Sequence, residues 1–187
     1  MALPVAGLMA VLLIVALAGC GGSGHGRASG PFAWLRPASP PTGWNVARTQ
    51  GGAVLAYPPR WAPIKTDPGT ASVALFGGGD RIDGYLNVTP RQGNETLADW
   101  SRFRLGHNQD EGDRGVRLVA ATTAARFRSG RGACVIDTYR TSKASYREIA
   151  CLVTGRHPSA VVVAAAPTAL WDQHAATLQR AVSSFVA

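Results

Sequence analysis

The sequence lacks the motifs that mark common hydrolases and nucleotide-binding enzymes. It contains no HExxH, GxSxG or GxxxxGKS/T pattern, and the glycine run at residues 77–79 lacks the lysine and hydroxyl that hold phosphate and magnesium. The histidines have no metal-ligand spacing and are expected to be surface residues: His25, His107, His157 and His174. We therefore expect no catalytic residue, no metal and no cofactor.

Charged side chains are absent from residues 1–19. The apolar centre of this run, residues 11–17, leads to Leu17, Ala18, Gly19 and Cys20. This order is typical of a lipobox, the site at which a bacterial lipoprotein precursor is cleaved and lipidated. The small residues suit the peptidase, and the Cys20 thiol accepts the lipid. The sequence predicts a signal peptide over 1–19, cleavage between Gly19 and Cys20, and anchoring through palmitate on Cys20.

A basic start is also missing from this run, which departs from the pattern of secretory leaders. We expect either a start codon further upstream or inefficient export. The alternative interpretation is an uncleaved transmembrane anchor, because 19 uncharged residues nearly span a bilayer core of about 30 Å. Both interpretations place the rest of the chain at the extracytoplasmic face of the cell membrane.

Cysteine is scarce, with three residues in the chain. Lipidation of Cys20 leaves Cys134 and Cys151, an even pair in an oxidising compartment, where a disulfide is more common than a metal or redox site. Two predicted strands, residues 133–140 and 146–153, form a hairpin if the turn closes on residues 141–144. That register places the two cysteines opposite each other. It also places Asp137 opposite Glu148, and this pairing of like charges argues against the register.

Lysine is nearly absent: Lys65 and Lys143 stand among 19 basic residues, and the net charge is +8. The arginine bias fits a GC-rich coding sequence, which is the alternative to a selected anion-binding surface. The candidate surface is a patch of Arg102, Arg104, Arg126, Arg128 and Arg131, in which Arg126 and Arg128 share a strand face by alternation. Beyond the membrane held through Cys20, anionic lipid or wall polymer are the expected partners. Nucleic acid is not expected, and the sequence identifies no protein partner.

A tether over residues 20–43 precedes a single domain over 44–187. Residues 21–30 are rich in glycine and serine and predict a flexible coil. Residues 31–43 contain four prolines that stiffen the chain, and their apolar side chains are expected to pack on the domain: Phe32, Trp34 and Leu35.

Periodicity within the domain predicts eight strands and two helices. The predicted strands cover residues 44–49, 53–57, 71–76, 84–89, 116–127, 133–140, 146–153 and 160–166. Thr96 and Asp99 resemble a capping box that begins a helix with Leu97, Trp100 and Phe103 on its inward side. The last helix follows Pro167, with an apolar stripe of Trp171, Ala175, Leu178, Val182 and Phe185. The order of elements predicts an α+β domain with a mainly antiparallel sheet covered by helices.

The turn at residues 108–113 offers oxygen ligands from Asn108, Asp110 and Asp113. A calcium-binding EF-hand loop would need a glutamate at position 119, where Val119 stands. We therefore expect a solvated loop, with calcium binding as the alternative.

The element order resembles the PsbP-like family. The resemblance rests on Tyr57, Pro58 and Trp61, the hairpin that ends at Thr89, the helix that opens at Thr96, and a closing helix after an apolar strand. It implies a PsbP-like α/β/α sandwich, a fold seen in extrinsic photosystem proteins and many bacterial lipoproteins. It also implies a docking or assembly role rather than catalysis, with no functional residue carried over.

These observations predict an envelope lipoprotein with a non-catalytic binding, docking or assembly domain. The alternative is an extracytoplasmic enzyme, a hydrolase with a site that sequence motifs do not reveal. A cleft that gathers Asp137, Glu148 and a histidine would favour the enzyme.

Overall fold

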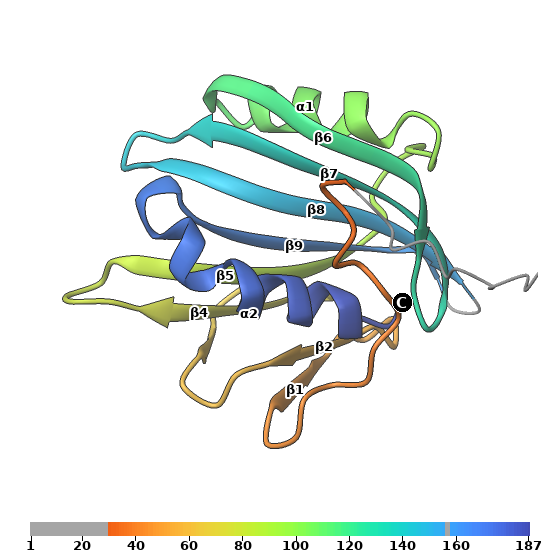
Figure 1. Cartoon of the computed structure of the whole chain (residues 1–187), viewed down its shortest axis with the longest axis horizontal. Coiled ribbons are helices and arrows are strands. Elements are labelled where there is room, and N and C mark those ends of the chain that lie inside the picture. Colours follow the sequence, from red (N-terminus) through yellow and green to blue (C-terminus); the bar gives the residue numbers. More distant parts are fainter. Residues whose placement is uncertain (1–29, 156–157) are drawn as a thin grey trace, which may run out of the picture.

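Residues 30–155 and 158–187 are described by the computed structural model of the chain. Seven of their strands form one antiparallel sheet in the order β3-β4-β5-β9-β8-β7-β6, while β1 and β2 form a separate hairpin (Figure 1). The strands are β1 (Asn45–Arg48), β2 (Val54–Tyr57), β3 (Ala62–Ile64), β4 (Ala71–Phe76), β5 (Ile82–Pro90), β6 (Arg114–Arg126), β7 (Gly130–Arg140), β8 (Ser145–Gly155) and β9 (Ala160–Pro167). The helices are α1 (Trp100–Asp110), the 3-10 helix η1 (Thr168–Leu170) and α2 (Trp171–Ser184).

The predicted signal peptide over 1–19, the cleavage site at Gly19 and Cys20, and the tether over 20–29 lie outside the described residues, as do His25 and His157. Within residues 30–155 and 158–187, no helix has the length and apolar character needed to cross a bilayer.

The sheet is covered by α2 on one face and by α1 on the other (Figure 1). On the α2 face, Leu178, Val182 and Phe185 pack with alternate residues of the central strands, among them Cys151 and Val162. On the opposite face, Trp100 of α1 packs with the intervening residues: Ala133, Val135, Ala150, Leu152, Val161 and Val163. The expected α+β class, a mainly antiparallel sheet between helices, is confirmed.

The predicted strands all form, with ends shifted by up to three residues. Strand β3 was not predicted, because three residues that include Pro63 give too short a pattern for a strand. The reciprocal contacts predicted between Thr96 and Asp99 form, with Thr96 N donating to Asp99 Oδ1 at 2.6 Å and Asp99 N donating to Thr96 Oγ1 at 3.4 Å, but they do not cap the helix, whose N-cap is Asp99. These contacts form a turn, after which α1 begins at Trp100.

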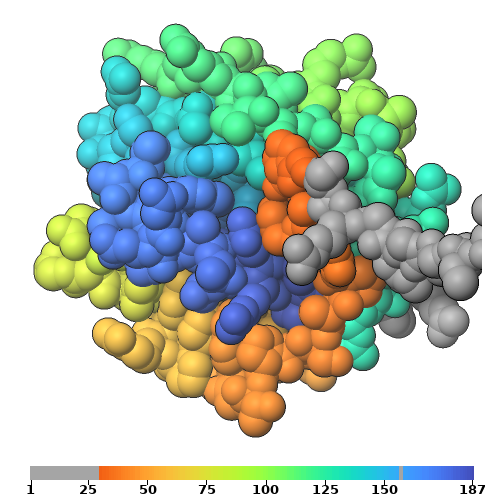
Figure 2. Space-filling model, viewed as in Figure 1, coloured from red at the N-terminus to blue at the C-terminus, as the bar shows by residue number. Residues whose placement is uncertain are grey.

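The segment before β1 packs on the domain, as its apolar residues predict. Phe32, Trp34 and Leu35 contact the core on the α2 face. Ala38 N donates to Ser183 O of α2 at 3.0 Å, and Figure 2 shows this orange segment against the blue C-terminal helix. The packed part of the chain therefore begins before Trp44.

The inward side of α1 differs from the predicted stripe of Leu97, Trp100 and Phe103. Trp100 is buried, but Phe103 is 38% exposed. The buried line instead continues from Trp100 to Arg104 and Asn108, at spacings of four residues. Two polar side chains thus point from α1 toward the sheet, where they meet two carboxyl groups.

Candidate functional site

The β7–β8 hairpin has the predicted register. Thr141 N donates to Ala144 O at 3.0 Å in the turn, Cys134 lies opposite Cys151, and Asp137 lies opposite Glu148. The two cysteines form the expected disulfide. Because facing residues of antiparallel strands point the same way, the two carboxyl groups lie side by side. They face α1 and are 0% and 1% exposed.

Arg104 neutralises this buried pair from above. Its Nε donates to Glu148 Oε1 at 2.7 Å and its Nη2 to Glu148 Oε2 at 2.8 Å, so the contact is bidentate. Tyr139 Oη donates to Glu148 Oε2 at 3.4 Å, and Asn108 Nδ2 donates to Asp137 Oδ2 at 3.5 Å. The cluster of Arg104, Asn108, Asp137, Tyr139 and Glu148 is called the acid cluster below.

Burial controls the protonation of the acid cluster. It raises the pKa of Asp137 to about 8, with a further rise from the Glu148 charge, which Arg104 opposes. Asp137 is therefore mainly protonated and neutral at pH 7. Burial would lower the pKa of Arg104, but the Glu148 carboxylate raises it above its ordinary value. The cluster holds one ion pair and one neutral acid, which accounts for two carboxyl groups side by side beneath a helix.

The acid cluster does not form the cleft that would favour an enzyme. His107 lines a cavity of about 40 Å³ together with Glu95, Trp100, Phe103 and Arg104, but neither Asp137 nor Glu148 lines it. The His107 ring stacks instead on Phe103, with 6.3 Å between centroids. Both carboxyl groups are closed off beneath α1: Glu148 is bound by Arg104 and Tyr139, and Asp137 contacts Asn108 through Oδ2 while its buried Oδ1 has no hydrogen-bond partner among the described residues. Their arrangement suits stabilisation of the α1–sheet packing rather than attack on a substrate.

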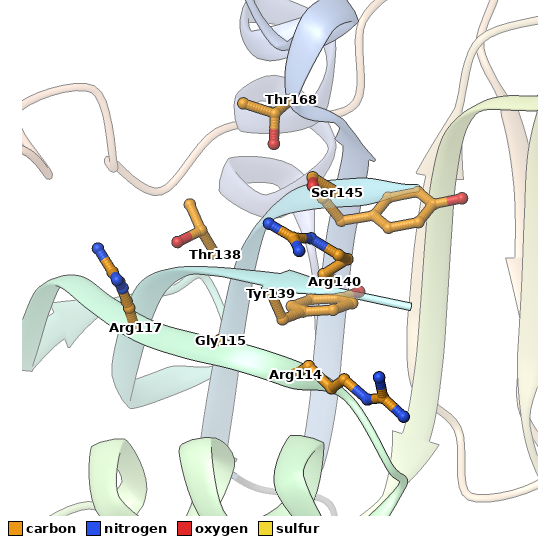
Figure 3. Close-up of a pocket in the computed structure, with 9 residues that line it drawn as sticks. Arg114, Gly115, Arg117, Thr138, Tyr139, Arg140, Ser145 and Thr168 are labelled. Atoms are coloured by element: carbon orange, nitrogen blue, oxygen red, sulfur yellow. The ribbon is translucent and has the colours of Figure 1, made fainter. Parts of the chain in front are cut away.

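A cavity lined by arginines opens at the start of β6 and the end of β7, next to Tyr139 of the acid cluster (Figure 3). Its volume is about 360 Å³. Three arginines line it, Arg114, Arg117 and Arg140, together with Gly115, Tyr139, Tyr146 and the hydroxyl residues Thr138, Ser145 and Thr168. Figure 3 shows Arg117, Thr138, Arg140 and Thr168 on one side of the strands. We call this site the arginine cavity.

A β-bulge brings two of these arginines to one site. Arg114 pairs with Arg140 and Arg117 pairs with Thr138, so β6 has one residue more than β7 in this stretch. Gly115 lies in the bulge with a φ of 62°, a left-handed backbone that glycine adopts without steric cost. Strict alternation would send Arg114 and Arg117 to opposite faces. The extra residue places the backbone of both arginines opposite alternate residues of β7, Arg140 and Thr138, and Figure 3 shows the Arg114 side chain extending away from Arg117.

The face of β7 that carries Thr138 and Arg140 is the face that α2 covers. Thr138 pairs with Arg147 of β8, and the Arg147 guanidinium lies 5.0 Å from the centroid of the Trp171 ring in α2. No carboxylate lines the arginine cavity. In the described part of the chain, ion pairs within 4 Å join Arg81, Arg102 and Arg104 to acids, and none involves Arg114, Arg117 or Arg140. The cavity therefore combines three uncompensated positive charges with hydroxyl donors.

The predicted arginine patch does not form as one surface. Arg104 is wrong as a member, because its side chain is 13% exposed and is bound to Glu148. Arg102 projects from α1 and lies 3.9 Å from Asp99. Arg126 and Arg131 face each other at the β6–β7 turn. Arg128 lies in that turn, beyond the end of β6, so the expected shared strand face with Arg126 does not apply.

The candidate calcium turn is divided between the interior and the surface. Asn108 is buried and its amide contacts Asp137, while Asp110 is exposed at the end of α1. Burial raises the pKa of Asp113, as does the charge of Glu148. Across residues 30–155 and 158–187 there is no group of three acidic, histidine or cysteine side chains placed to hold a metal.

The arginine cavity could not be recognised from residue spacing alone. The predicted strand began at Val116, after Arg114, and the bulge at Gly115 was not expected. A signal does exist in the sequence: the turn at residues 127–130 joins β6 and β7 in a hairpin. Pairing along this hairpin places the start of β6, with Arg114, beside the end of β7, with Arg140. For the acid cluster, the signal was the like-charge pair itself, because two facing carboxyl groups require a nearby cation.

Neither a protein-family model nor a curated protein sequence matches the chain. Several solved structures have a similar fold, including the two that follow. Cyanobacterial PsbP (CyanoP) from Synechocystis sp. PCC 6803 matches with a TM-score of 0.56 at 19% identity, over 78% of this chain and 92% of that chain. A protein of unknown function, PA94 from Pseudomonas aeruginosa, matches with a TM-score of 0.52 at 14% identity, over 77% of this chain and 96% of that chain. At these identities the likeness concerns the fold, and it confirms that the chain has a PsbP-like α+β fold.

Proposed function

We propose that this chain is an envelope lipoprotein, held at the outer side of the cell membrane through a lipid on Cys20, and that its domain binds an anionic ligand without catalysis. The proposed location is supported by the order Leu17, Ala18, Gly19, Cys20 and by the buried Cys134–Cys151 disulfide. Disulfides persist mainly in extracytoplasmic compartments.

The observation that carries the binding role is the arginine cavity. Guanidinium groups bind carboxylate and phosphate oxygens in a bidentate manner, and Arg114, Arg117 and Arg140 line one open volume of about 360 Å³ without an acid. Arg114 and Arg140 are paired across β6 and β7, so two positively charged residues border the cavity from neighbouring strands. Anionic lipid and anionic wall polymer both carry suitable groups.

The non-catalytic role is supported by the location of the acids. Asp137 and Glu148 are the buried carboxyl pair, and they contact Asn108 and Arg104 beneath α1 rather than lining the arginine cavity. General acid–base catalysis needs a titratable group within hydrogen-bond reach of the substrate. An anion in the arginine cavity would meet guanidinium and hydroxyl groups, which suit binding.

Binding is tested by titrating the purified chain, carrying Cys20→Ser so that no lipid of its own is attached, with inorganic phosphate and with soluble anionic wall polymer. We expect binding that weakens with rising salt and falls at least about tenfold, or about 1.4 kcal/mol, in Arg114→Gln/Arg140→Gln. Arg48→Gln removes one exposed charge from β1 and serves as the control. A wild-type chain that binds neither anion, or an equal loss in the control, would refute the proposal.

The anchor is tested separately, by feeding a bacterial host an alkyne-tagged fatty acid and detecting the label on the chain. We expect label on the wild type and none on Cys20→Ala. Label that persists on Cys20→Ala would contradict the assignment of the lipid to this cysteine.

A further inference from the structure

A second cavity shares Tyr146 with the arginine cavity and has a volume of about 400 Å³. Three segments line it: the β4–β5 loop with the start of β5, the β7–β8 turn, and η1 with the residue before it. Its apolar lining consists of Ile82, Ala144, Tyr146, Pro167, Ala169 and Leu170, and three charged residues also line it: Asp80, Arg81 and Lys143. We call it the apolar cavity.

The two cavities are neighbours along two segments of the chain. In the β7–β8 hairpin, Ala144 lines the apolar cavity and Ser145 lines the arginine cavity. At η1, Thr168 lines the arginine cavity, and Pro167 and Ala169 on either side of it line the apolar cavity. Hydroxyl and guanidinium groups thus gather in the arginine cavity, whereas the next cavity combines an apolar wall with three charged residues at its border: Asp80, Arg81 and Lys143.

Each volume is near the lower end of the range of roughly 300–1,000 Å³ found for small-molecule sites. A ligand that occupies both would place its charge against Arg114, Arg117 and Arg140 and its hydrocarbon against Ile82, Pro167 and Leu170. The arginine cavity offers three guanidinium groups and no carboxylate, whereas in the apolar cavity Arg81 is already paired with Asp83. At both η1 and the β7–β8 hairpin, neighbouring residues line one cavity and then the other. Adjacent cavities of this kind fit a molecule that has an anionic group at one end and hydrocarbon at the other.

We propose that the arginine cavity and the apolar cavity bind the two ends of one anionic amphiphile, a molecule with a phosphate or carboxylate head and a hydrocarbon tail. The inference rests on the proposed function, because it uses the same arginine cavity for the head. It commits to a single molecule held in the two cavities, since the apolar residues line a recess. An intact membrane surface would instead meet a flat face.

The test compares ethyl phosphate with decyl phosphate, both below the micelle-forming concentration, by calorimetric titration of the Cys20→Ser chain. The two probes have the same head group and differ in tail length. Each methylene that becomes buried strengthens binding about fourfold. We therefore expect decyl phosphate to bind at least about tenfold more tightly than ethyl phosphate. Arg114→Gln/Arg140→Gln should weaken both probes.

Ala169→Trp separates the two cavities, because Ala169 is an exposed residue of η1 that lines only the apolar one. We expect this variant to bind ethyl phosphate like the wild type and to lose the gain from the decyl tail. Ala62→Trp, at an exposed site on β3 that lines neither cavity, is the matched control and should leave both affinities unchanged. Ile82→Asn provides a second test if the tryptophan variant does not fold.

Equal affinity for the two phosphates would overturn the amphiphile inference and leave the anion site standing. The proposed function would be overturned as well if the wild-type chain bound neither phosphate. It would also be overturned if Arg114→Gln/Arg140→Gln bound both phosphates as tightly as the wild type. A third arm uses vesicles of anionic and neutral phospholipid. Binding to vesicles alone, undiminished by Ala169→Trp, would show attraction to a charged surface and would overturn the binding of a single molecule.

Discussion

Arg104 of α1 and Glu148 of β8 are 44 residues apart in sequence and form a bidentate ion pair, with N–O distances of 2.7 and 2.8 Å. The Glu148 side chain is 1% exposed and the Arg104 side chain 13%. Such a pair stabilises little relative to a well-packed apolar pair, because both charges are withdrawn from water. Removal of one partner, however, leaves a buried charge without compensation.

Arg104→Met should therefore destabilise the protein strongly. We expect a loss of about 3–5 kcal/mol in the free energy of unfolding, since Glu148 stays buried without its cation. Urea denaturation followed by tryptophan fluorescence measures this. Arg102→Met, at a side chain that is 86% exposed on the same helix, is the control and should change stability by less than about 0.5 kcal/mol. Equal effects of the two variants would contradict the role given to the ion pair.

The protonated Asp137 predicts a pH dependence of stability. Its pKa is raised from 3.8 to about 8 in the folded protein, first by burial and then by Glu148. The folded state therefore binds more protons than the unfolded state between these values, so this group's stabilising contribution is full below pH 3.8 and is lost as pH rises through about 8.

Asp137→Asn removes this titration and keeps a polar side chain beside Asn108. Relative to the wild type, the variant should gain stability as pH rises from about 4 to about 8, with a slope approaching 1.4 kcal/mol per pH unit. Urea denaturation at several pH values measures the difference between the two proteins. Asp110→Asn, at an exposed site, should follow the wild type. Parallel curves for wild type and Asp137→Asn would show that Asp137 is ionised in the folded state.

Much of the fold could be predicted because its signals are local. Strand β9 is apolar at nearly every position, which indicated a central strand covered on both faces. The apolar stripe of α2 was equally regular, and Trp171, Leu178, Val182 and Phe185 are all buried. The β7–β8 register followed from the turn at residues 141–144, and the disulfide and the acid pair followed from the register.

The sites were harder to predict because they depend on long-range geometry. Arg104 was assigned to a surface patch on the basis of its charge. Its buried position becomes evident only when α1 is placed over Glu148. The arginine cavity depends on a bulge at Gly115 that shifts β6 against β7, and a simple alternating pattern does not reveal such a shift.

Gly84 and Trp61 provide a test of core packing. A Cβ added at Gly84 would lie 2.6 Å from Cη2 of Trp61, whose indole is buried against β5. Gly84→Ala should therefore overpack the core and cost about 1–3 kcal/mol of unfolding free energy. Gly78→Ala, where a Cβ would meet open space, is the control and should have little effect. A tolerated Gly84→Ala would show that the indole can move without cost.

The Cys134–Cys151 disulfide predicts a thiol count and a stability change. Both cysteines are 0% exposed, and the bond joins β7 to β8 across a sequence separation of 17 residues. In the chain-entropy model, closing a loop of this size by a disulfide stabilises the protein by about 3 kcal/mol. Cys134→Ala/Cys151→Ala should therefore lose about 3 kcal/mol in the free energy of unfolding, measured by urea denaturation.

A thiol count tests the bond directly. The denatured and unreduced Cys20→Ser chain should react with no thiol reagent, and it should react with two equivalents of the reagent after reduction. Two free thiols before reduction would show that the bond does not form in the protein as produced.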